Sequence, residues 1–259
     1  MVYVLFALAL LLAGNYKFHK DGFNERYLNP ESTEIIKGIF IALIFCGHFS
    51  QYVKFTNPLD SPFFKVYWYM GQFVVAMFLL YSGYGLMLSV KNKGMSYVKK
   101  LPTHRILKTL LHFDLAVSIY MVIYIAKHGM PSVEKFVLAM LGWDGFGNSN
   151  WYIFAILSIW CTVYAVFRLF GVRHLLWKLC LCTLGICLLA FVVSKYKPTY
   201  WYNTMICFPL GMWVAMYKAQ IENVLFPACL KIKKSIGGGA KMAFDYHLLY
   251  PGNNSFGKA

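Results

Sequence analysis

The sequence predicts an all-α protein, a polytopic integral membrane bundle of about seven transmembrane helices. Apolar residues make up 59% of the 259 positions and charged residues only 14%, with a mean hydropathy of +0.53. Soluble domains carry about 25% charged residues and about 45–50% apolar ones. The apolar residues also gather in stretches close to the roughly 20 residues that cross the hydrocarbon core of a bilayer.

The first apolar stretch, 1–14, is interpreted as a short first span or signal anchor. It is not preceded by the basic residues that open a signal peptide. The loop 15–34 follows and carries three basic residues, which favour a cytoplasmic location. Near its end, Asn29-Pro30 and Ser32-Thr33 are residue types that favour the start of a helix.

Six further spans are expected within a membrane domain that covers residues 35–217. They are 35–53, 71–90, 106–126, 151–168, 175–194 and 200–217. A loop is expected over 91–104, and residues 218–259 form a basic cytoplasmic tail.

The Lys and Arg residues support this arrangement of spans, because basic residues concentrate in cytoplasmic loops. When alternate loops are assigned to opposite sides, 19 of the 25 fall inside. The six outside are Lys54, Lys65, Lys127, Lys135, Lys195 and Lys197. The bias predicts a multi-pass plasma-membrane protein with its N-terminus outside and its C-terminus in the cytoplasm.

The formal net charge of +15 would also suit a nucleic-acid partner. However, the charges lie in the loops between apolar runs, so membrane lipid is the expected partner and nucleic acid is not. The seven cysteines lie within or beside apolar runs, which argues against a disulfide framework. Cys180 and Cys182 lack a second pair of ligands, so no metal site is expected.

The stretch from Glu34 to Ser50 places one histidine deep in an apolar span. Lys37 and His48 are eleven residues apart, so their side chains point the same way and lie roughly 16 Å apart along the helix. A titratable group at that depth is costly and usually faces a bundle interior or a hydrated cavity. A buried histidine bonded to a neighbouring carbonyl or hydroxyl is the alternative.

A second candidate group begins the span after the expected loop. Spacings of three, four and seven put Arg105, Lys108 and His112 on one helix face. This cationic stripe suits either a polyanion or lipid phosphates reached by long side chains. Asp114 lies at a depth comparable to that of His48, so it is a possible partner that orients the imidazole.

A third candidate is Ser82-Gly83-Tyr84-Gly85, inside an apolar helix. Small residues allow close helix packing, which by itself explains the glycines. The hydroxyl groups of Ser82 and Tyr84 still need partners in a bilayer.

Four motifs in order resemble the signature of membrane acyltransferase family 3, the O-acetylases of surface sugars. The first is Lys37, ten intervening residues and His48, and the second is Phe78-Leu-Leu-Tyr-Ser-Gly-Tyr84. The third is the basic start at Arg105 and Lys108, and the fourth is Asn150-Trp151-Tyr152. The resemblance covers roughly residues 31–217.

The resemblance implies transfer of an acyl group, expected to be acetyl, from cytoplasmic acyl-CoA to a hydroxyl of an extracytoplasmic glycan or lipid-linked acceptor. His48 would be the catalytic base, and no metal is implied. The CoA phosphates would be held by Lys37, Arg105 and Lys108. The substrate path would be lined by Ser82, Tyr84, Trp151 and Tyr152.

Two other interpretations remain open at this point. A polar-metabolite exporter would also place a histidine in a hydrated path. A truncated, non-catalytic member of the family is the other, because the family usually has more spans than this chain offers. Oligomeric state and acceptor identity have no signal in the sequence.

Overall fold

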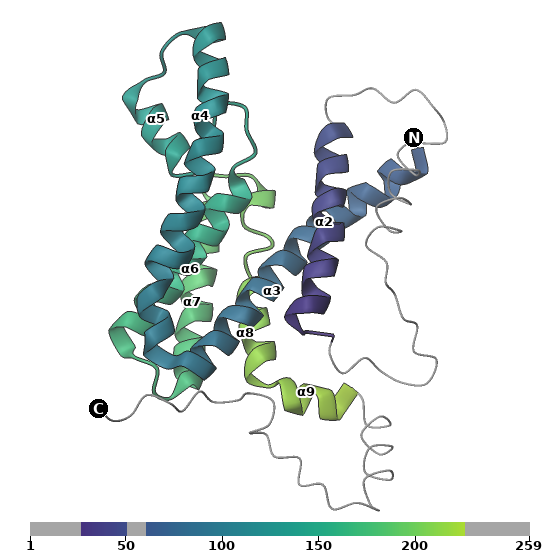
Figure 1. Ribbon diagram of the computed structural model, residues 1–259, viewed down its shortest axis with the longest axis vertical. Coiled ribbons are helices and arrows are strands. Elements are labelled where there is room, and N and C mark those ends of the chain that lie inside the picture. Colours follow the sequence, from purple (N-terminus) through teal and green to yellow (C-terminus); the bar gives the residue numbers. More distant parts are fainter. Residues whose placement is uncertain (1–26, 51–60, 226–259) are drawn as a thin grey trace, which may run out of the picture. The chain divides into compact units, whose positions relative to one another are not determined.

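Every secondary-structure element in the described part of the computed structural model is helical, which confirms the expected fold class (Figure 1). The structure describes residues 27–50 and 61–225, with side chains over 27–49 and 71–224. The stretch 1–14, most of the loop 15–34 and the tail beyond 225 lie outside the described residues. The chain divides into two compact units, and the described residues up to Tyr217 belong to the first.

The helices of the first unit follow one another with short connections. They are α2 (Pro30–Ser50), α3 (Ser61–Leu101), the π-helix η2 (Pro102–Leu107), α4 (Lys108–His128), α5 (Val133–Met140), α6 (Trp151–Phe170), α7 (Leu175–Ser194), the 3-10 turn η3 (Thr199–Trp201) and α8 (Cys207–Met216). The second unit contains α9 (Lys218–Leu225), in which Lys218 and Glu222 form an ion pair of 3.5 Å.

Four helical stretches are long and apolar enough to cross a membrane. They are Pro30–Phe49, Gly71–His128, Trp151–Phe170 and Leu175–Ser194. The last expected span, 200–217, instead contains the turn η3 and the shorter apolar helix α8. The helix α2 begins as its sequence indicates, at Pro30, with the Thr33 hydroxyl donating to the Pro30 carbonyl at 3.0 Å.

The expected loop over 91–104 is wrong, because this stretch is helical. The expected spans 71–90 and 106–126 lie in one continuous run of α3, η2 and α4. The direction changes at Gly94, whose φ of 57° and ψ of −139° are non-helical and accessible mainly to glycine. A charged stretch of Lys, Met and Leu remains helical because these are good helix formers, and one glycine supplies the bend.

The core of the first unit is a seam in which α3 and α8 pack backbone against backbone. A Cβ atom on Gly83 would lie 2.0 Å from the Phe208 carbonyl oxygen, and one on Gly211 would lie 2.0 Å from that of Leu80. Both positions therefore require glycine, as in other close helix pairs in membranes.

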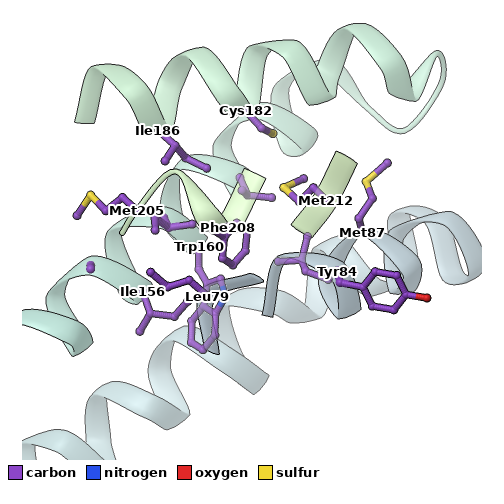
Figure 2. Packing of buried hydrophobic residues seen from close by; sticks show 14 of the residues in the cluster. Leu79, Tyr84, Met87, Ile156, Trp160, Cys182, Ile186, Met205, Phe208 and Met212 are labelled. Atoms are coloured by element: carbon purple, nitrogen blue, oxygen red, sulfur yellow. The ribbon is translucent and has the colours of Figure 1, made fainter. Parts of the chain in front are cut away.

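Large apolar side chains close the seam on either side of the glycines. Phe208 and Met212 of α8 lie beside Leu79 and Met87 of α3 (Figure 2). All four side chains are 0% exposed. Burial of a side chain of this size contributes about 1.5–3 kcal/mol, so this seam is the main stabilising contact of α8.

Two polar side chains beside this seam, Trp213 and Thr183, are paired. Trp213 of α8 donates its indole N–H to the Thr183 hydroxyl of α7 at 3.0 Å. Thr183 in turn donates to the Leu179 carbonyl one helical turn earlier, at 2.8 Å. The contact between α7 and α8 is thus a satisfied hydrogen-bond chain inside an apolar core, as burial requires.

Candidate active site

The helix α2 carries the first pair of candidate residues. Lys37 is half-buried, and its Nζ lies 5.9 Å from the ring centroid of Tyr81 on α3. His48 is exposed in the last turn of α2. The lysine is therefore joined to the segment of α3 that directly precedes Ser82, whereas the imidazole remains accessible.

Within the motif Ser82 to Gly85, one glycine packs against another helix and the other borders open space. Gly83 is committed to the contact with α8, as described above. Gly85 has nothing within 4 Å of an added Cβ, so its side of α3 is open. Ser82 is half-buried, and Tyr84 is buried with its hydroxyl at the end of a ring that extends away from the core (Figure 2). Packing thus explains one glycine of this motif but not the other.

Aromatic contacts connect α3 to helices on both sides. Phe78 of α3 meets Phe40 of α2, with ring centroids 6.0 Å apart, and Tyr152 of α6 at 6.4 Å. Tyr152 is half-buried and contacts its neighbour Trp151, whose ring also meets Tyr200 at 5.9 Å. The middle of α3 therefore brings together three of the four sequence motifs.

The basic motif behaves differently from what its spacing indicates. Arg105 is half-buried, with Cζ 5.6 Å from the Trp160 ring centroid and 6.0 Å from that of Tyr97. Lys108 and His112 are both exposed. Arg105 lies in the π-helix η2, whose turns are wider than those of the α-helix that the spacing assumed.

Asp114 is not paired with His48. It lies on α4, and its Oδ1 atom is buried without a hydrogen-bond partner among the residues that the structure describes. The helix α4 packs against η2, α5 and α6, whereas α2 packs against α3. The orienting role of Asp114 stays a prediction.

Two residues that the sequence did not single out, Tyr97 and Trp160, have their rings next to Arg105. The Tyr97 hydroxyl and the Trp160 indole nitrogen are buried and have no hydrogen-bond partner within 27–49 and 71–224. Nothing in the sequence distinguishes them, because Trp160 stands in an ordinary apolar span and Tyr97 in a basic stretch. Only the packing of α3, η2 and α6 puts both rings against one guanidinium.

Comparison with known proteins identifies the family. The family model for an acyltransferase domain, acyltransferase 3, matches residues 31–254. The chain belongs to this family. The match includes every candidate residue described above and extends beyond the expected limit of 217. No curated protein and no solved structure gives a significant match.

Membership in the acyltransferase 3 family confirms that the protein is an enzyme. It is an acyltransferase that transfers groups other than aminoacyl groups, and its apolar helices make it a membrane protein. An acyl donor and an acceptor are therefore its substrates. Among the described residues, no three His, Cys, Asp or Glu side chains form a group that could hold a metal ion.

Proposed function

We propose that this acyltransferase transfers an acetyl group from acetyl-CoA to a hydroxyl group of an extracytoplasmic glycan or lipid-linked sugar. The observation that carries the proposal is the convergence on α3. Lys37 contacts Tyr81, and Phe78 joins α2 to Tyr152 of α6, so motifs distant in sequence share one region. An exposed histidine stands on the same helix as the lysine.

In this proposal His48 is the general base. A neutral imidazole accepts the proton of the acceptor hydroxyl as the oxygen attacks the thioester carbonyl, and the thiolate of CoA leaves. The exposure of His48 in the last turn of α2 supports this role, because an acceptor must reach the ring directly. Asp114, whose Oδ1 atom is buried without a partner among the described residues, is proposed as the group that orients this imidazole.

The donor would be held by the basic residues. Lys37, Arg105 and Lys108 supply charge-assisted donors for the phosphates of CoA. Ser82, Tyr84, Trp151 and Tyr152 would line the path by which the thioester meets the acceptor. The open side of α3 at Gly85 supports a path along this helix.

The membrane arrangement is part of the proposal. Lys37, Arg105 and Lys108 would face the cytoplasm, where CoA is made, and His48 would lie toward the outer side. The protein would then be a multi-pass component of the plasma membrane with its C-terminus inside. The domain limits 1–14, 15–34, 35–217 and 218–259 are proposed on the same basis.

The test is acetyl transfer by the purified, membrane-reconstituted protein. Labelled acetyl-CoA is supplied together with extracted cell-envelope glycans, and the label in the glycan is measured. We expect His48→Ala to lower kcat by roughly 100-fold or more, the usual contribution of a general base. His128→Ala is the matched control, because His128 is also an exposed histidine in the last turn of a long helix.

Normal turnover by His48→Ala would remove the histidine from the mechanism. Absence of transfer by the unaltered protein would overturn the proposed substrates. Movement of labelled sugar across sealed vesicles without acetylation would instead indicate an exporter.

A further inference from the structure

Three hydrogen-bond donors gather where α3, η2 and α6 meet. The Arg105 guanidinium lies within 6.0 Å of both ring centroids, those of Tyr97 and Trp160. Trp160 is only 8% exposed, and its Nε1 has no partner among the described residues. The Tyr97 hydroxyl is buried and equally without a partner there.

The two buried donors would be satisfied by an acceptor from outside the described residues. A buried donor without a partner costs about 1–3 kcal/mol, and an indole N–H cannot accept a hydrogen bond from arginine. The guanidinium offers five N–H groups and likewise accepts none. The Tyr97 hydroxyl oxygen can accept, but neither Arg105 nor Trp160 donates to it, so the described contacts of these three residues are ring contacts.

The charge of Arg105 and the basic sequence around it favour an anionic acceptor. Between Gly71 and Phe113 the chain contains no Asp or Glu. The same stretch has six basic residues, which are Lys91, Lys93, Lys99, Lys100, Arg105 and Lys108. An anion from outside the chain would be stabilised chiefly by the charge of Arg105, which lies against both rings.

The local backbone supports a binding role for this place. Arg105 is carried by a π-helical turn that begins at Pro102, where the missing N–H interrupts the regular pattern. Single π-helical turns occur frequently at functional sites. Here the turn puts Arg105 against α6 while Lys108 remains at the surface.

We propose that Tyr97, Arg105 and Trp160 form a phosphate-binding site for the acyl donor, in which the Trp160 indole and the Tyr97 hydroxyl each donate to a phosphate oxygen. The inference rests on the proposed function, and it adds two donor-binding residues. A phosphate fits because its several oxygens accept bonds from donors in different directions. A neutral glycan acceptor would not use the positive charge.

The experiment compares Trp160→Phe and Tyr97→Phe with the unaltered protein in detergent. Each change removes one donor and keeps an aromatic ring beside Arg105. Equilibrium binding of CoA is measured, together with the KM for acetyl-CoA and for acetyl-pantetheine, which has no phosphate. We expect each variant to bind CoA roughly tenfold more weakly and to raise the KM for acetyl-CoA only.

Trp213→Phe is the matched control, because its indole N–H already donates to Thr183. It should lower thermal stability and leave CoA affinity unchanged. Trp160→Phe should lower thermal stability only through the buried volume that it removes, since no hydrogen bond within the described residues is lost. If Trp160→Phe fails to fold, Tyr97→Phe provides the same test.

CoA affinity in both variants equal to that of the unaltered protein would overturn the inference, and so would no binding of CoA by the unaltered protein. If the two variants instead retain less labelled phosphatidylglycerol and bind CoA normally, the site binds a lipid phosphate. That result would also overturn the inference. Weakened CoA binding in a protein that transfers no acetyl group would support this site and reject the proposed function.

Discussion

The seam between α3 and α8 and the site around Arg105 share one helix but differ in every physical respect. At the seam, Gly83 and Gly211 bring two backbones into contact, and the side chains around them are apolar and fully buried. Further along α3, Tyr97 meets the Arg105 guanidinium, which also meets the Trp160 ring, and two buried polar atoms have no partner among the described residues. Close packing is complete at the first place, whereas the second lacks an acceptor.

Two tryptophans show the same contrast, because one indole N–H is paired within the described residues and the other is not. Trp213 donates its N–H to Thr183 beside the seam, whereas Trp160 has no acceptor beside Arg105. A membrane protein is under strong pressure to pair such groups, because the bilayer core offers no water. The unpaired donors are therefore better explained by a ligand than by stability. Variants of the two regions should accordingly affect different measurements.

The largest effect is expected for Gly83→Ala, because the new Cβ would overlap the Phe208 carbonyl oxygen. The backbones must separate, at a cost of at least about 3 kcal/mol, the upper end of typical overpacking. Thermal unfolding in detergent measures it. Gly85→Ala is the control within the same motif, and it should be neutral or stabilising by up to about 1 kcal/mol, since space is open there. Equal unfolding temperatures for both variants would contradict the packing described for the seam.

The next effect concerns donor binding. Arg105→Ala should raise the KM for acetyl-CoA by roughly 100-fold, since hydrogen bonds to a charged group are worth about 1.5–3 kcal/mol each. Arg105→Lys should recover only part of the loss, because lysine keeps the charge but not the planar fork or the ring contacts. Arg168→Ala, at an exposed position on α6, is the control and should leave the KM unchanged. An equal rise in KM for Arg105→Ala and Arg168→Ala would indicate that positive charge anywhere on the protein attracts acetyl-CoA.

A smaller effect is the difference in stability between variants of the two tryptophans. Trp213→Phe should lower the free energy of unfolding by about 1 kcal/mol more than Trp160→Phe, because only the former breaks a hydrogen bond. Both changes remove the same side-chain atoms, and the hydrogen bond of Trp213 is the difference that this comparison tests. Urea or thermal unfolding of the two variants in the same detergent measures it. The reverse order would show that Trp160 is paired in the ligand-free protein.

The smallest effect is expected at Lys108, which is exposed while Arg105 is half-buried. Lys108→Ala should raise the KM for acetyl-CoA by less than about threefold, and added salt should remove the difference, since an exposed charge is screened. KM measurements at low and high ionic strength test this. A rise in KM as large as that caused by Arg105→Ala would show that Lys108 and Arg105 contribute equally to donor binding.

The fold class and the family were predictable from the sequence because both depend on patterns along the chain. Apolar stretches must be helical in a bilayer, where every backbone polar group needs an internal partner. The family motifs from Lys37 to Tyr152 are also read in order along the chain. The bend at Gly94 was missed because a glycine with a positive φ can stand inside an otherwise helical run.

The candidate site was predictable only in part. The contacts of Lys37 with Tyr81 and of Phe78 with Tyr152 join the motifs that the sequence singled out. The expected alignment of Arg105 with Lys108 and His112 assumed a regular helix, whereas Arg105 lies in a π-helical turn, so the alignment stays a prediction. The roles assigned to these residues stay predictions until activity is measured.

The sequence by itself determined that this chain is a helical membrane acyltransferase, since hydropathy and family motifs are properties of the linear order. Only the tertiary structure decided which glycine is needed for packing and which aromatic residues meet Arg105. Whether a polar atom has a partner depends on atoms from helices distant in the chain. No linear pattern contains that information.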